Sequence, residues 1–159
     1  YLNDSCCPSI EQAALAHFME CGGLARHLRR VRKELMARHQ ALIEGLRRYA
    51  GGRVDIVDTP AGMHVVAWLN GYDHARADAL VAHALTRGLG LYPMARYVHQ
   101  PPPRAGLLLG YGRLSTSALR EAMQLFGQCL DEMEAGGRHT PHRHGAGFGR
   151  AGAAGPMEP

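Results

Sequence analysis

The stretch Val54-Asp55-Ile56-Val57-Asp58-Thr59-Pro60-Ala61-Gly62-Met63-His64-Val65-Val66-Ala67-Trp68-Leu69 decides the fold class of this chain. The β-branched residues at 54–57 and the apolar run at 63–69 predict two short strands. Residues 58–62 contain a proline and a glycine and predict the turn between the strands. The stretch therefore predicts an antiparallel hairpin, and it marks a change from the helical spacing that precedes it.

Two helices are predicted before the hairpin. The first begins at Ser9, whose hydroxyl can cap it, and ends or kinks at Gly22-Gly23. The second runs from about residue 24 to residue 49 and ends at Gly51-Gly52. Its predicted apolar stripe consists of Leu24, Leu28, Val31, Leu35, Met36, Leu42, Ile43 and Leu46.

Helices and strands also alternate after the hairpin. Asp73 can cap a helix that runs to Arg87 and is closed by Gly88. Short strands are predicted at 89–93 and at 107–111, with a proline-containing loop at 95–104 between them. One helix and two strands are therefore predicted to follow the hairpin.

A last helix is predicted from the cap residue Ser115, and its apolar spacing ends after Glu134. The side chains expected to face inward are Leu119, Met123, Phe126, Cys129 and Leu130. Residues 136–159 are rich in Gly, Ala, Pro, Arg and His and predict a disordered tail.

Together these elements predict an α+β fold, with a mostly antiparallel sheet and helices packed on one face. The expected organisation is an irregular N-terminus at 1–8, long helices at 9–50, a sheet domain at 51–135 and the tail at 136–159.

The composition fits one globular domain. The chain has 159 residues, of which 46% are hydrophobic, and a formal net charge of +4. No apolar run approaches the roughly 18–20 residues of a membrane span, and no signal peptide is visible. The chain does not begin with Met, which suggests a processed product or a fragment. The cysteines form no CxxC pair and indicate reduced thiols in a cytoplasmic protein; they are Cys6, Cys7, Cys21 and Cys129.

Basic residues mark the long helix. Lys33 is the single lysine of the chain, and the other 17 basic residues are arginines. One helix face carries Arg29, Arg30, Arg32, Lys33, Arg38, Arg47 and Arg48. Such a face could follow nucleic-acid phosphates, but Glu34 and Glu44 interrupt it and no aromatic residues interleave with it. A solvated or interface-facing helix is therefore the favoured interpretation.

Other candidate sites give weaker signals. His139, His142 and His144 have spacings that could bind a transition metal, but no fold fixes them, so a low-affinity site without function is favoured. The sequence contains no GxSxG and no P-loop motif, and no carboxylate pair stands out. His64, which follows the hairpin turn, is more simply a hydrogen-bonded strand residue than a catalytic one.

Arg96 follows the strand at 89–93 directly and lies in the loop. A guanidinium that a loop holds on a rigid scaffold is suited to bidentate recognition of a carboxylate. Pattern alone favours an ordinary surface arginine at this position.

Five blocks of the sequence, in matching order and spacing, resemble MocR-type regulators of the GntR family, over about residues 9–133. The blocks are residues 9–18, 27–32, 61–66, 91–97 and 107–112. In that family a winged helix-turn-helix is joined to an aminotransferase-like domain of the type I pyridoxal-phosphate fold. The resemblance is to the C-terminal end of that domain, so it implies interdomain helices at 9–50 and the small domain at 51–135.

The resemblance implies a sensor of amino acids or amines. In the intact protein, pyridoxal 5'-phosphate would bind to a large domain whose lysine lies upstream of this chain, and Lys33 does not match that lysine. Arg96 matches an arginine that contacts the effector carboxylate, and His64 would lie near the substrate opening. A homodimer is implied, and DNA would be bound only through the winged helix.

Two alternatives remain open from the sequence. Ordinary aminotransferases usually carry their carboxylate-binding arginine in the stretch that corresponds to 107–111, and its absence here favours a regulator over an enzyme. A class I/II aminotransferase is nevertheless one alternative, and a stand-alone interaction module or gene remnant is the other.

Overall fold

The computed structural model describes residues 8–59 and 62–137. Its sheet has four strands in the order β1-β2-β4-β3, and every neighbouring pair is antiparallel. The strands are β1 (Val54–Val57), β2 (His64–Leu69), β3 (Tyr92–Pro93) and β4 (Gly106–Gly110). The predicted hairpin and the predicted α+β class are therefore confirmed.

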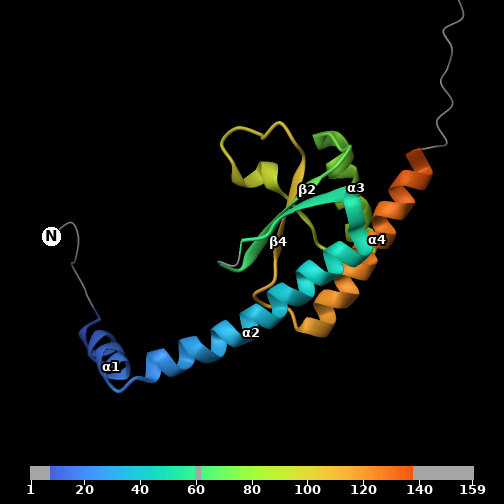
Figure 1. The fold of residues 1–159 in the computed structure, drawn as a ribbon. Coiled ribbons are helices and arrows are strands. Elements are labelled where there is room, and N and C mark those ends of the chain that lie inside the picture. Colours follow the sequence, from blue (N-terminus) through green and yellow to red (C-terminus); the bar gives the residue numbers. More distant parts are fainter. Residues whose placement is uncertain (1–7, 60–61, 138–159) are drawn as a thin grey trace, which may run out of the picture.

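Four α-helices accompany the sheet in the part of the chain that the structure describes (Figure 1). They are α1 (Ser9–Glu20), α2 (Gly23–Gly45), α3 (His74–Thr86) and α4 (Thr116–Gly137). Helix α2 continues into a π-helical turn at Leu46–Ala50 and a 3-10 turn at Gly51–Arg53, and a second 3-10 turn occupies Met94–Tyr97. The order of helices and strands is the predicted one.

The core lies between one face of the sheet and the helices. Side chains of β2 alternate between buried and less buried, as expected for a strand that is covered on one side. The C-terminal part of α2, together with α3 and α4, supplies the covering side chains. The largest fully buried ones are Phe126, Leu42, Leu46, Leu80, Leu107, Leu119, Leu130, Val65 and Cys129. The inward residues predicted for the last helix are all among the buried residues.

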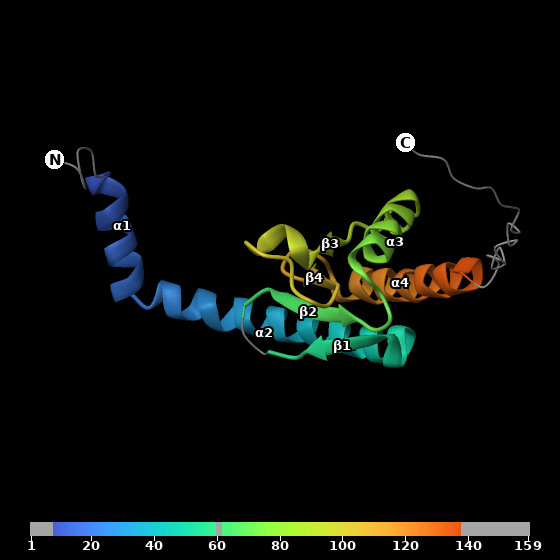
Figure 2. The same cartoon turned by 90° about the horizontal axis from the view of Figure 1, so that it is seen from above.

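The N-terminal arm, defined here as α1 and the first half of α2, projects from this core (Figures 1 and 2). No residue of α1 is buried. Figure 2 shows α1 turned away from the axis of α2 at the free end of the arm. The break between the two helices is at Gly22, which has a φ of 71°.

The predicted apolar stripe of the long helix is only partly correct. Its residues from Leu42 onward are buried and Leu35 is partly buried against the core, whereas Leu28 is 42% exposed and Met36 is 71% exposed. Helical spacing shows which residues share a face, but it does not show whether another element covers that face. The first half of α2 lies beyond the edge of the small sheet domain.

Two of the three predicted helix caps are confirmed, and one predicted strand is shorter than expected. Asp73 accepts a hydrogen bond from the Arg76 amide at 2.7 Å, and Ser115 accepts one from the Ala118 amide at 3.1 Å, as predicted. Ser9 is not a cap, because α1 already includes it and its N-cap position is Pro8. The strand predicted at 89–93 is reduced to Tyr92–Pro93.

Several sequence predictions fall outside the described residues. These include the three histidines at 139, 142 and 144, Cys6 and Cys7, and the predicted tail beyond Gly137. Helix α4 itself continues through Gly137, two residues past the expected domain boundary. Cys21 and Cys129, both described, are free thiols. No described helix is long and apolar enough to cross a membrane.

Candidate functional site

Arg96 projects from a turn that the sheet holds in place. Pro93 pairs with Leu107 of β4 and is buried, and its φ of −61° starts the 3-10 turn at Met94–Tyr97. Leu91, just before the strand, is also buried. The Arg96 side chain is exposed and makes no hydrogen bond or ion pair with any described residue. The guanidinium is therefore free to accept a ligand while its backbone is anchored.

Most arginines of the sheet domain already have partners. Arg87 pairs with Glu132, Arg104 pairs with Asp55, and Arg53 pairs with Asp131. Arg113 and Arg120 resemble Arg96 in having no hydrogen-bond or ion-pair partner within residues 8–59 and 62–137. Arg96 lies in the 3-10 turn that follows β3, Arg113 lies three residues after β4, and Arg120 lies within α4.

His64 and the strand before Arg96 pair with different positions along β4. It pairs with Gly110, whereas Pro93 pairs with Leu107, so the two sites are separated by roughly 10 Å along β4. The His64 ring packs over β4, since a Cβ at Gly110 would lie 3.3 Å from His64 Cδ2. The antiparallel register thus separates His64 from the strand that precedes Arg96.

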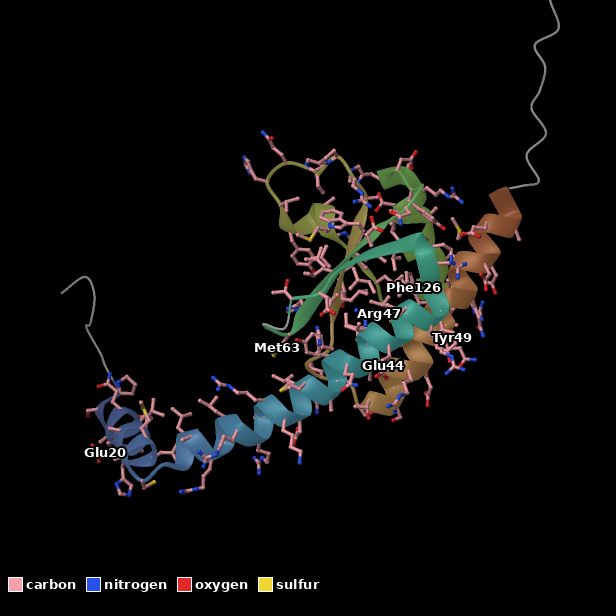
Figure 3. The ribbon with its side chains drawn as sticks, viewed as in Figure 1. Glu20, Glu44, Arg47, Tyr49, Met63 and Phe126 are labelled. Atoms are coloured by element: carbon pink, nitrogen blue, oxygen red, sulfur yellow. The ribbon has the colours of Figure 1, made fainter. Side chains whose placement is uncertain are left out.

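A groove that sequence reasoning missed runs between α2 and the tip of the β1–β2 hairpin (Figure 3). We call it the α2 groove; its volume is about 1200 Å³. It is lined by Arg29, Arg32, Lys33, Leu35, Met36, Ala37, His39, Gln40, Gly62, Met63 and Tyr111. The helical spacing of the three basic residues was visible in the sequence, but their proximity to Met63 and Tyr111 depends on how the hairpin packs against α2.

Polar contacts fix the hairpin to α2 beside this groove. The Tyr111 hydroxyl donates a hydrogen bond to the Gly62 carbonyl at 2.8 Å, and Arg38 donates one to the Gly112 carbonyl. The rings of His39 and Tyr111 meet edge to face, with centroids 5.4 Å apart. His39 Nε2 is 3.3 Å from an Asp58 carboxylate oxygen, although it is not aligned for a hydrogen bond. The groove wall is therefore held from several sides.

Lys33 does not fit a Schiff-base role. Schiff-base lysines are activated by desolvation or by a neighbouring cation, usually in an enclosed pocket. Lys33 is exposed on the rim of the α2 groove. Lys33 is therefore unsuited to form a Schiff base with pyridoxal phosphate. The described residues contain no group of three His, Cys, Asp or Glu side chains placed to hold a metal.

Cys129 is a core residue, as predicted. It is fully buried in α4, and this burial raises the pKa of its thiol. A thiol in that environment stays protonated and is a poor nucleophile.

Curated relatives of the chain are transcriptional regulators. It is 32% identical over 113 residues to the uncharacterized HTH-type transcriptional regulator YhdI of Bacillus subtilis, covering 71% of this chain and 24% of that protein. It is 30% identical over 127 residues to the probable rhizopine catabolism regulatory protein MocR of Rhizobium meliloti, covering 79% and 25%. The chain thus spans about a quarter of the length of these relatives. No family model matches the chain.

Solved structures with the same fold are aminotransferases. The multiple substrate aminotransferase from Thermococcus profundus matches with a TM-score of 0.73 at 20% identity, over 83% of this chain and 32% of that one. LysN, the alpha-aminoadipate aminotransferase from Thermus thermophilus, matches with a TM-score of 0.66 at 24% identity, over 76% and 31%. At these identities the likeness establishes the fold alone.

The fold therefore defines this chain as part of a type I aminotransferase-like domain. Its curated relatives are HTH-type regulators, MocR among them, which confirms the resemblance predicted from the five sequence blocks.

Proposed function

We propose that this chain is the part of a MocR-type transcriptional regulator that senses an amino acid, with Arg96 binding the carboxylate of the effector. The observation that carries the proposal is the position of Arg96. Its side chain has no described partner, and its backbone is anchored by the buried residues Leu91 and Pro93. The homology to HTH-type regulators supports a sensing role over a catalytic one.

The chemistry of the guanidinium suits a carboxylate. Its planar N–H groups can donate two parallel hydrogen bonds to the two carboxylate oxygens, and such charge-assisted bonds are stronger than neutral ones. Because β3 is fixed to β4, little backbone conformational entropy is lost at this turn when the ligand binds. A ligand that binds one conformation of the regulator better than another would shift the population toward that conformation.

The proposal extends to the longer protein that the relatives represent. There, pyridoxal 5'-phosphate would be held by residues outside this chain, DNA would be bound by an HTH domain, and the protein would be a cytoplasmic homodimer. His64 would be a second residue near the effector opening, because it is exposed at the start of β2.

Arg96 variants test the proposal in the longest natural polypeptide that contains this chain. Calorimetric titration would compare amino acids with the amines that lack their carboxylate. The wild type should bind an amino acid more tightly than its amine. Arg96→Ala should lose about 2–3 kcal/mol, or roughly 30- to 150-fold in affinity, for the amino acid only. Arg96→Lys should recover part of this loss, because lysine keeps the charge but not the bidentate geometry.

Arg120→Ala is the matched control, since Arg120 is also exposed and has no partner in the described part of the chain. An equal loss in both variants, or an unchanged titration in Arg96→Ala, would contradict the assigned role. Release of the keto acid from a bound amino acid would instead indicate an aminotransferase. Binding of neither amino acids nor amines would favour an interaction module.

A further inference from the structure

The loop that carries Arg96 joins β3 to β4 and is anchored at both ends. At its start, Pro93 pairs with Leu107 of β4. At its end, Ala105 is buried, and its carbonyl accepts a hydrogen bond from the Leu69 amide at 2.9 Å. Figure 1 shows this loop in yellow, extending from the sheet between the two strands. The part between the anchors needs contacts of its own to hold one conformation.

Arg104 secures the last part of the loop. It donates a hydrogen bond to Asn70 Oδ1 at 2.8 Å and pairs with the Asp55 carboxylate. The Asn70 amide donates a further hydrogen bond to Asp55 at 3.0 Å, so the three side chains form a closed network. This network joins the loop to β1 and to the turn after β2, but it contacts the chain well after Arg96.

A histidine from another element contacts the middle of the loop. His74 Nε2 lies 2.8 Å from the Pro102 carbonyl oxygen. Because a carbonyl oxygen can only accept, Nε2 is the donor. No other side-chain hydrogen bond joins residues 94–103 to the rest of the described residues. The three consecutive prolines at 101–103 have no backbone N–H, so this segment cannot donate backbone hydrogen bonds that would fix it.

His74 is itself held in place. It is the first residue of α3, directly after the N-cap Asp73, whose side chain accepts a hydrogen bond from the Arg76 amide at 2.7 Å. The buried side chains of Ala77 and Leu80 fix the same helix in the core. His74 is half-buried, which limits the competition of water for its hydrogen bond. The imidazole therefore connects the loop to a rigid part of the fold.

We infer that His74 is a positioning residue for the effector site, and that its hydrogen bond to Pro102 holds the loop in the conformation in which Arg96 meets a carboxylate. The inference rests on the proposed function of Arg96. A contact in the middle of a loop shortens the segment that is free to move. A loop that adopts the binding conformation for only part of the time lowers the apparent affinity by that fraction.

Arg96 is a cleavage site for trypsin, so the conformation of the loop can be tested without any effector. In the longest natural polypeptide that contains this chain, His74→Leu should accelerate cleavage after Arg96 by about 2- to 12-fold. This range corresponds to the loss of one net hydrogen bond, and cleavage follows the population of the open loop. An unchanged cleavage rate would overturn the inference.

Two amide variants test whether the hydrogen bond itself is responsible. His74→Gln should restore the wild-type cleavage rate, because the glutamine amide can donate from a position similar to that of Nε2. His74→Asn should cleave as fast as His74→Leu, because its amide is one methylene shorter and falls short of the Pro102 carbonyl. Equal rates for the glutamine and asparagine variants would contradict the assigned hydrogen bond.

His83→Leu is the matched control. His83 also belongs to α3 and has one side-chain hydrogen bond, at 2.6 Å, but its partner is Glu132 of α4. The substitution should lower the stability of the protein without accelerating cleavage after Arg96. Equal acceleration in His74→Leu and His83→Leu would show that both act only through the stability of α3, and it would overturn the inference.

Effector titration provides the second arm of the test. His74→Leu should weaken binding of the amino acid by about 2- to 12-fold and leave binding of the matching amine unchanged. In the Arg96→Ala background it should have no further effect, since the group that it positions is gone. Additive effects of the two substitutions would contradict a positioning role.

The inference and the proposed function can fail separately. A loss of affinity in Arg96→Ala with none in His74→Leu would refute the positioning role and leave the effector site of Arg96 intact. An unchanged titration in Arg96→Ala would refute the effector site, whereas the cleavage rates would still show whether His74 fixes the loop.

Discussion

Arg53 connects the turn after α2 to α4 through hydrogen bonds and ion pairs. Its guanidinium donates hydrogen bonds to the carbonyls of Ala50 at 3.0 Å and Tyr49 at 2.6 Å, and it pairs with Asp131 at 2.5 Å. Carbonyls at a helix end have no partner within the helix and need one elsewhere. Arg53 supplies it and thereby fixes the Tyr49 carbonyl against α4.

That fixed carbonyl explains a glycine in the middle of α4. A Cβ at Gly127 would lie 2.8 Å from the Tyr49 carbonyl oxygen and 2.9 Å from Tyr49 Cβ. We expect Gly127→Ala to lower the free energy of unfolding by about 1–3 kcal/mol, because backbone must move to admit the methyl group. Urea unfolding measures this change.

Gly136→Ala is the control within the same helix. A Cβ at that position would meet nothing within 4 Å, so alanine should be neutral or stabilising by up to about 1 kcal/mol through helix propensity. Equal effects of the two substitutions would show that the contact with Tyr49 is unimportant.

At the scale of elements, α3 and α4 are joined at their surface by an ionic cluster. Glu132 of α4 accepts hydrogen bonds from Arg87 and from His83, the latter at 2.6 Å, and Arg87 also donates to Gln128 at 3.0 Å. The hydrogen bond from Arg87, followed by that from His83, lowers the pKa of Glu132 below its ordinary value of 4.5. The charged form of Glu132 therefore favours the folded state.

The sign of this shift sets a pH dependence. Because the pKa of Glu132 is lower in the folded protein, its contribution is present above pH 4.5 and is lost as the pH falls through the folded value. Glu132→Gln should thus unfold more readily than wild type at neutral pH. The two urea midpoints should converge in acid, and a constant difference down to about pH 3 would contradict this assignment.

Helix starts and the hairpin could be predicted from sequence, because short-range interactions determine them. The caps Asp73 and Ser115 and the hairpin at β1 and β2 follow from side-chain hydrogen bonding and β-branched residues. The exposure of Met36 and the shortness of β3 were not predictable, because both depend on which distant element lies alongside. No pattern in the sequence predicts the π-helical turn at Leu46–Ala50.

The candidate site was also only partly predictable from sequence. Arg96 could be selected from its place after a strand, and its role remains a prediction. The α2 groove could not be found from sequence, since Arg29 and Lys33 are indistinguishable there from any solvated helix face. Only the packing of the hairpin, through Tyr111 and Gly62, places an apolar wall beside them.

At the scale of the whole molecule, the stability of the sheet domain does not depend on α1. Helix α1 contributes no residue to the core. We expect deletion of residues 1–22 to leave the sheet domain folded. The thermal midpoints of the wild type and of the truncated chain should therefore be nearly equal. A markedly lower midpoint in the truncated chain would show that α1 stabilises the sheet domain.

The central claim is that this chain works as the aminotransferase-like part of a longer regulator. The most direct test is the mass of the native polypeptide, determined by immunoblotting its source with an antibody to this chain. The 113 residues aligned with YhdI make up 24% of that protein, so a polypeptide of similar length would have about three times the mass of this chain. A band of that size, with an HTH segment in its sequence, is the predicted result. A single band near 17.3 kDa would contradict the claim.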